Sequence, residues 1–115
     1  MRLDSHQHFW SYSESEYGWI DERMSRIRRD FAPGDLEPIL RRNGFDGSVA
    51  VQVRQSLEET EYLLGLADDH DFIRGVVGWV DLRSPAARRD LERFSEHVRF
   101  RGVRHIDQAE PDARF

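Results

Sequence analysis

Four short apolar runs are spaced along the chain and predict β-strands. They span residues 2–9, 47–53, 72–81 and 100–106. The second and third runs are rich in valine, which is typical of strands buried in a sheet. Polar residues gather late in these runs, so we expect them at the carboxyl ends of the strands, where parallel α/β folds place their active sites.

Helical patterns separate the four runs. Asp35 is the expected N-cap of a first helix, with Pro38 in its first turn and Gly44 as its C-terminal stop. Ser56 and Glu59 have the spacing of a capping box at the start of a second helix. These signals place one helix between the first two strands and another between the second and third.

A third helix is expected after Ser84, which would be its N-cap, followed by Pro85. The order is then strand, long loop, helix, and three further strands separated by single helices. Such alternation favours parallel βαβ units, and right-handed crossovers put successive helices on the same side. We therefore predict an α/β fold with four parallel strands in the order 1-2-3-4 and three helices on one face.

Two histidines lie near the end of the first run. Because side chains alternate along a strand, Asp4, His6 and His8 share the face opposite Leu3, with the two imidazoles about 7 Å apart. Two imidazoles on one face can converge on one metal ion or one substrate. The alternative is a pair of surface histidines on an edge strand.

The second and third runs supply further candidates. Ala50, Gln52 and Trp79 are expected on a face left open by the helices. Gln52 and Trp79 are candidate site residues, although Gln52 could be a buried amide with a backbone partner and Trp79 a core aromatic. Asp81 is a weaker candidate, since it could only cap the next loop.

Composition excludes several classes of protein. The net charge of −5 argues against nucleic acid and anionic membranes as partners. No apolar run approaches the length of about 20 residues that a membrane span needs. Asp4 and His6 interrupt any signal-peptide core, so a cytoplasmic protein is expected. The absence of cysteine and lysine rules out disulfides, thiolate metal sites and Schiff-base chemistry in these residues.

Several segments resemble a known family in order from residue 3 to about residue 106. They are "DSHQHFW", "DFAPGDLEPILRRNGFDGSVAVQV", "GVVGWVDL" and "FRGVRH". This pattern is similar to the amidohydrolase-related family, and within it to the L-fuconolactonase and sugar-lactonase branch. The resemblance implies a (β/α)8 barrel that hydrolyses lactones such as L-fucono- or L-rhamnonolactone by water attack on the carbonyl.

The resemblance also implies roles for particular residues. His6 and His8 match the family's first-strand His-x-His and are the expected catalytic residues, and they would hold a zinc or manganese ion if one is bound. Some members of the branch are thought to work without metal. His105, in "GVRH", is a lesser candidate from the fourth strand. The expected substrate-binding residues are Gln52, Trp79, Arg104 and His105.

The length of the chain limits what it can do alone. A (β/α)8 barrel needs roughly 250 residues, and 115 residues supply only four strands and three helices. We therefore expect residues 1–115 to be the N-terminal portion of a single barrel domain, inactive alone and prone to self-association through the open barrel face. The alternative function is a non-catalytic remnant that keeps the scaffold without the chemistry.

Overall fold

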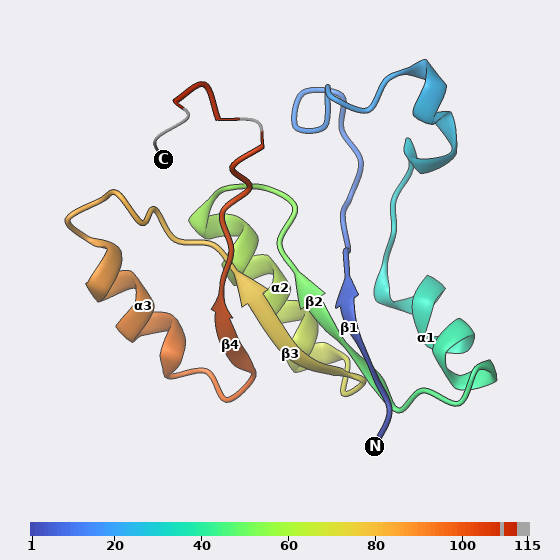
Figure 1. Cartoon of the computed structure of the whole chain (residues 1–115). Helices are drawn as coiled ribbons and strands as arrows, with labels where there is room; N and C mark the ends of the chain where they lie inside the picture. The colour runs from blue at the N-terminus through green and yellow to red at the C-terminus, as the bar shows by residue number, and fades with distance from the viewer. Residues whose placement is uncertain (109, 113–115) are drawn as a thin grey trace.

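The computed structural model describes residues 1–108 and 110–112, and its centre is a four-stranded parallel sheet. The strands follow the order β1-β2-β3-β4, and every neighbouring pair is parallel. This confirms the predicted topology (Figure 1). The strands are β1 (Leu3–Gln7), β2 (Gly47–Val51), β3 (Ile73–Gly78) and β4 (Phe100–Val103), and the helices are the 3-10 helix η1 (Glu22–Ile27), α1 (Pro33–Arg42), α2 (Leu57–Asp69) and α3 (Ala87–Ser95).

The three α-helices cover one face of the sheet. Leu40 of α1, Leu63 of α2 and Phe94 of α3 belong to a single buried cluster. Ala50 and Val76 from the two central strands complete that cluster. Figure 1 shows α2 behind the central strands, with α1 and α3 to either side. The helices therefore share a side, as right-handed crossovers require.

The expectation that Ala50 lies on the open face is wrong. Ala50 is fully buried in the core cluster against the helices. Its neighbour Val49 is only half-buried, and the side chains of Val49 and Arg101 flank Gly75 on the other side of the sheet. Alternation of side chains along a strand shows which residues share a face, but not which face the helices cover. Self-association through the open face stays a prediction.

The start of α1 differs from the prediction. The helix begins at Pro33 with Ala32 as its N-cap, so Asp35 is not the cap. Proline suits a first helical position because its φ is already helical and it has no N–H to leave unpaired. The Asp35 carboxylate instead accepts a hydrogen bond from the Ala32 backbone N–H at 3.0 Å. The earlier start also moves Pro38 out of the first turn and into the helix.

The end of α1 is as predicted. Gly44 has φ +73°, a left-handed conformation that favours glycine. The Gly44 N–H donates to the Arg41 carbonyl at 3.1 Å, and the Phe45 N–H donates to the Leu40 carbonyl at 2.9 Å. This is the Schellman arrangement, which satisfies two carbonyls at the helix end.

The predicted starts of the second and third α-helices are confirmed only in part. Ser56 caps α2 by accepting from the Glu59 N–H at 3.2 Å. The Glu59 carboxylate does not return to Ser56 as a capping box requires; it bonds Val53 and Arg54 instead. The third helix begins at Ala87 rather than directly after Ser84, because residues 84–87 form a separate turn first.

Each strand ends earlier than predicted, and this sets where the candidate site lies. Strand β1 ends at Gln7, β2 at Val51, β3 at Gly78 and β4 at Val103. His8, Gln52, Trp79 and Arg104 are therefore the first residues after their strands, where the chain leaves the sheet at its carboxyl edge. These residues keep their common location. The Gln52 N–H still donates to the Val77 carbonyl at 2.8 Å and the Arg104 N–H to the Gly78 carbonyl at 3.0 Å, so β3 holds both backbones just beyond the strand ends.

A close approach between α2 and β3 fixes the backbone of Trp79. The Thr60 hydroxyl donates to the Trp79 carbonyl and accepts from the Trp79 N–H, both at 2.7 Å. The approach depends on Gly78, where an added Cβ would lie 2.6 Å from Thr60 side-chain atoms. Helix α2 therefore takes the place of a strand partner for Trp79.

Replacing Gly78 by alanine is expected to destabilise the fold by about 1–3 kcal/mol, because the new methyl group forces Thr60 away from Trp79. The matched control is Gly65→Ala on the exposed side of α2, where a Cβ meets nothing within 4 Å. That change should stabilise the helix by about 0.5–1 kcal/mol. Thermal denaturation of the two variants measures both effects. Equal effects of the two substitutions would contradict the close packing of Gly78.

The long β1–α1 loop, residues 8–32, is folded on its own aromatic side chains. Trp10 and Phe31 exchange backbone hydrogen bonds of 3.0 and 2.8 Å, which close the loop at its base. Tyr17 and Ile20 are almost completely buried within it. The loop therefore forms an ordered wall beside the carboxyl edge of the sheet (Figure 1). Among the described residues, no helix combines the length and apolarity that crossing a membrane requires.

Candidate active site

The two histidines, one near the end of β1 and one just after it, converge on each other. Their Nε2 atoms are 3.2 Å apart, and the ring centroids are 4.9 Å apart with the planes at 78°. Asp4 does not join them: its carboxylate accepts from the His6 backbone N–H and from the Gln7 side-chain amide. The register of β1 against β2 shifts between Asp4 and Gln7, so strict alternation fails there.

The tautomer of His8 follows from its backbone partner. His8 Nδ1 lies 2.9 Å from the Val51 carbonyl oxygen. A carbonyl can only accept, so Nδ1 carries the proton and donates, and Nε2 of neutral His8 is left as an acceptor. Burial lowers the pKa of His8, and the nearby His6 and Arg104 lower it further. His8 therefore presents an unprotonated Nε2 toward His6 at neutral pH.

The histidine pair fits a divalent metal ion. Two imidazole nitrogens that bind one zinc ion at about 2.0–2.1 Å in tetrahedral geometry lie roughly 3.3–3.4 Å apart. The observed 3.2 Å is close to that value. The bond from His8 to Val51 is also the kind of second contact that orients a metal-binding histidine. Among the described residues there is no group of three or more histidines and carboxylates that could complete a site.

Acidification is expected to destabilise the metal-free chain through His8. Its folded pKa lies below the usual 6.5, so the unfolded chain binds more protons as the pH falls past 6.5. The free energy of unfolding therefore drops from about pH 6.5 downward until the folded His8 also protonates. Histidine NMR in EDTA measures the His8 pKa directly, and His8→Gln should flatten this part of the stability profile. A His8 pKa at or above 6.5 would contradict the burial of this ring.

A guanidinium from the end of β4 lies beside this corner. Arg104 Nε and Nη2 donate to the Gln52 side-chain oxygen at 2.9 and 2.6 Å, and Nη2 also donates to the Gln52 carbonyl at 2.5 Å. In the described part of the chain Arg104 pairs with no carboxylate. Gln52 is fully buried, and its Nε2 has no partner there. Gln52 thus holds Arg104 in place and leaves Nη1 for a ligand.

Trp79 and His105 are brought together, apart from the histidine pair. The Trp79 indole N–H donates to His105 Nδ1 at 3.0 Å, and His105 Nε2 donates to Glu110 at 2.6 Å. Both nitrogens of His105 are therefore used within the protein. The sequence-based expectation that Trp79 and His105 bind substrate stays a prediction, and Glu110 was not anticipated.

A cavity of about 1000 Å³ opens between the β1–α1 loop and the carboxyl edge of the sheet. His8 and Arg104 line it from the sheet side, and Trp10 and Trp19 line it from the loop. Tyr17 also lines it; burial, and then the charge of Glu59, raise the pKa of Tyr17 to about 12, so its hydroxyl stays protonated. The cavity therefore combines aromatic walls with an imidazole, two guanidinium groups and one carboxylate, a composition suited to a small polar ligand.

Three charged residues near the cavity were missed by the sequence reasoning. Glu59 is 0% exposed and accepts from the Val53 and Arg54 backbone N–H groups, both at 2.8 Å. Arg54 lines the cavity and pairs with Glu16 of the β1–α1 loop at 2.8 Å. The local pattern marks Glu59 only as a helix-start residue. Its burial depends on the loop after β2, which no spacing rule describes.

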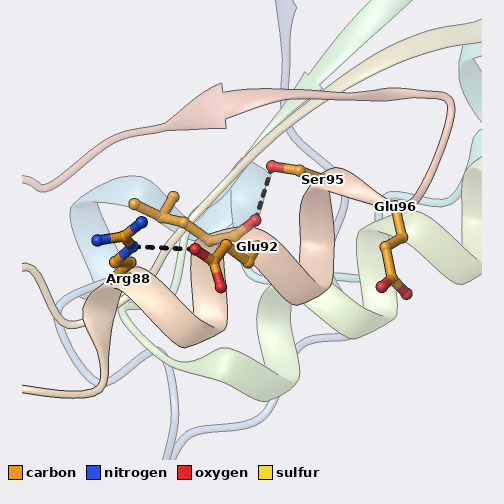
Figure 2. Close-up of a pocket in the computed structure, with 5 residues that line it drawn as sticks. Arg88, Glu92, Ser95 and Glu96 are labelled. Carbon is orange, nitrogen blue, oxygen red and sulfur yellow. Dashed lines mark hydrogen bonds and ion pairs between the residues drawn. The ribbon is translucent and has the colours of Figure 1, made fainter.

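A second hollow, of about 550 Å³, lies along α3 (Figure 2). Two of its polar contacts lie within the helix: Arg88 donates to Glu92 at 3.0 Å, and Ser95 donates to the Leu91 carbonyl at 2.6 Å. All its lining residues come from this one helix and its end. It presents no group of convergent side chains, so the cavity at the carboxyl edge is the candidate active site.

Comparison with known proteins shows that the chain is similar to the N-terminal part of known enzymes. The chain is 42% identical over 108 residues to the L-fucono-1,5-lactonase of Burkholderia ambifaria, which covers 94% of the chain and 37% of that protein. It is 43% identical over 116 residues to the L-fucono-1,5-lactonase of Burkholderia multivorans, covering 99% and 38%. The chain thus spans less than two-fifths of the length of these relatives.

Solved structures show the same relation. The crystal structure of an amidohydrolase from Burkholderia multivorans with bound zinc superimposes with a TM-score of 0.90 at 43% identity, over 99% of this chain and 40% of that one. The structure with bound HEPES gives a TM-score of 0.92 at 41% identity, over 99% and 39%. The four parallel strands and their helices correspond to the N-terminal part of these barrels.

The family profile described as amidohydrolase (Amidohydro_2) matches residues 3–115, almost the whole chain. The expected family and fold are thereby confirmed. This chain belongs to the amidohydrolase family.

Proposed function

We propose that residues 1–115 form the N-terminal portion of a hydrolase that opens sugar lactones such as L-fucono-1,5-lactone. The observation that carries the proposal is the convergence of the His6 and His8 Nε2 atoms to 3.2 Å, beside an arginine that pairs with no carboxylate in the described residues. The similarity to two L-fucono-1,5-lactonases supports the substrate class.

The residues present can perform distinct parts of the reaction. The unprotonated Nε2 of His8 can accept a hydrogen bond from the attacking water and orient it. Arg104 stays protonated although burial lowers its pKa, and it can stabilise the negative charge that develops on the lactone carbonyl oxygen. Addition of water to the carbonyl carbon and cleavage of the ring C–O bond give one hydroxyl group and one carboxylate, and one proton is released to solvent.

A divalent ion fits the same corner. His6 and His8 would hold it, and when bound it would supply Lewis acidity and a water molecule of lowered pKa. Two protein ligands are fewer than the three usual in catalytic zinc sites, so we place the remaining ligands in the part of the barrel that these residues do not form. The same part is the expected source of the general base.

The decisive experiment reads the gene beyond codon 115 and assays the polypeptides. We expect an in-frame continuation that encodes further βα units, lactone hydrolysis by the longer polypeptide, and none by residues 1–115 alone with zinc or manganese added. Residues across a barrel must be placed to within about 1 Å for full catalysis, which one side of the ring cannot provide. A stop codon together with no hydrolysis would favour the non-catalytic scaffold instead.

A further inference from the structure

The cavity at the carboxyl edge is richer in positive charge than the rest of the chain. Its charged lining residues are Arg54, Arg104 and Glu16, while the whole chain has a net charge of −5. Two guanidinium groups in one cavity of an acidic chain are suited to an anionic ligand, provided that the acidic side chains beside them can give way. Arg104 has a place in the proposed reaction, and Arg54 does not.

Arg54 has one fixed and one replaceable acidic partner. The fixed partner is Glu59, which is completely buried and held by two backbone N–H groups; its Oε1 lies 3.5 Å from Arg54 Nη2. The replaceable partner is Glu16, whose side chain is 47% exposed on the β1–α1 loop and accepts from Arg54 Nη1 at 2.8 Å. Only the second contact can be exchanged without breaking a buried network.

The charges around the cavity balance as they stand. Arg54 and Arg104 contribute two positive charges, and Glu16 and Glu59 contribute two negative ones. A ligand carboxylate that enters while Glu16 stays would leave one negative charge uncompensated in a partly desolvated cavity, where repulsion is stronger than in water. A ligand carboxylate that replaces Glu16 on Arg54 avoids this repulsion, because the Glu16 side chain, already 47% exposed, can turn to solvent.

We propose that Arg54 binds the carboxylate of a hydroxy acid, and that Glu16 occupies this position as an internal competitor when the acid is absent. Arginine is suited to carboxylates because its N–H groups form two parallel charge-assisted hydrogen bonds. Trp10 and Trp19 offer aromatic surface for the carbon skeleton of the same ligand. The proposal rests on the proposed function, because lactone opening produces such an acid.

The test is a binding titration with L-fuconate, the acid formed from L-fucono-1,5-lactone, followed by tryptophan fluorescence because Trp10 and Trp19 line the cavity. Glu16→Gln removes the competitor and should tighten binding at least about threefold, whereas Arg54→Gln should weaken it at least about tenfold. The matched control is Glu14→Gln on the same loop, which should bind as the parent chain does. Uncharged L-fucitol should respond to none of these changes.

The outcomes separate the two proposals. If L-fuconate binds equally to the parent chain and to Glu16→Gln, the competitor role of Glu16 is wrong, and if it binds equally to Arg54→Gln, the role of Arg54 is wrong; the lactone assignment stands in both cases. D-lactate, a hydroxy acid without a sugar skeleton, is titrated in parallel. If D-lactate binds more tightly to Glu16→Gln and more weakly to Arg54→Gln while L-fuconate does not bind, the carboxylate site stands and the sugar-lactone assignment fails. If neither acid binds even to Glu16→Gln, the site is wrong. Should Arg54→Gln fail to fold, the sign of the Glu16→Gln effect decides alone, since loss of a merely structural ion pair would not tighten binding.

Discussion

Replacing Glu59 by alanine is expected to lower the free energy of unfolding by about 3 kcal/mol or more. The carboxylate is completely buried and accepts from the Val53 and Arg54 backbone N–H groups. Its removal leaves two partly buried backbone donors without their partner, each at a cost of about 1–3 kcal/mol, and an empty space where the buried carboxylate was. The loop after β2 then loses its anchor to α2, and with it the placement of Arg54. Denaturant unfolding of the variant measures the loss.

Glu61→Ala is the matched control on the same helix. The Glu61 side chain is 53% exposed and makes one ion pair, with Arg93 at 2.9 Å. Exposed pairs contribute about 0–1 kcal/mol, so this variant should unfold almost as the parent does. Glu59→Gln keeps an acceptor oxygen and should fall between the two, which keeps the test usable if Glu59→Ala does not fold. Equal losses for Glu59→Ala and Glu61→Ala would refute the anchoring role.

The double replacement of His6 and His8 by alanine is expected to lower kcat/KM for lactone hydrolysis at least about tenfold in the full hydrolase that we propose. The converging imidazoles act on the attacking water, directly or through a metal ion, and a tenfold loss corresponds to about 1.4 kcal/mol of transition-state stabilisation. The measurement is steady-state hydrolysis of L-fucono-1,5-lactone by the folded double variant.

His70→Ala controls for the loss of an imidazole as such. His70 lies at the C-terminal end of α2 and contacts Phe72 at the opposite end of the strands from the site. Its removal should leave kcat/KM within about twofold of the parent value. If the double variant of His6 and His8 keeps full activity while folded, the two histidines have only a structural role.

The topology was predictable because it depends on local hydrophobic patterns and on the right-handedness of βαβ crossovers. Valine-rich runs separated by single helices indicate parallel βαβ units, and the handedness of the crossovers then fixes the side of the helices. The helix starts were less predictable. Asp35 is a residue type that often caps a helix, whereas the fixed φ of Pro33 favours the first helical position. The two residues therefore predict different starts for α1, and the start at Pro33 is the one observed.

The candidate site was predictable only where its residues are close in sequence. His6 and His8 are two residues apart, so alternation along a strand predicts that they share a side; the register shift at the end of β1 and the bond from His8 to Val51 accompany their closer approach. Arg104 and Gln52 are 52 residues apart, and their bond depends on where two strands end. The ion pair between Arg54 and Glu16 joins the loop after β2 to a loop 38 residues earlier. No periodicity describes such a contact, since it forms only when both loops fold over the sheet.

The most direct test of the paired histidines is a zinc titration of the chain followed by NMR of the imidazole nitrogens. The geometry predicts that the Nε2 signals of His6 and His8 shift together at one equivalent of zinc, while His8 Nδ1 keeps its proton on the Val51 carbonyl. The signals of His70, His97 and His105 should not move at that ratio, and His8→Ala should abolish the response at His6. Zinc that binds first at His97 and Asp68, or that leaves His6 and His8 unchanged, would contradict the proposed metal-binding corner.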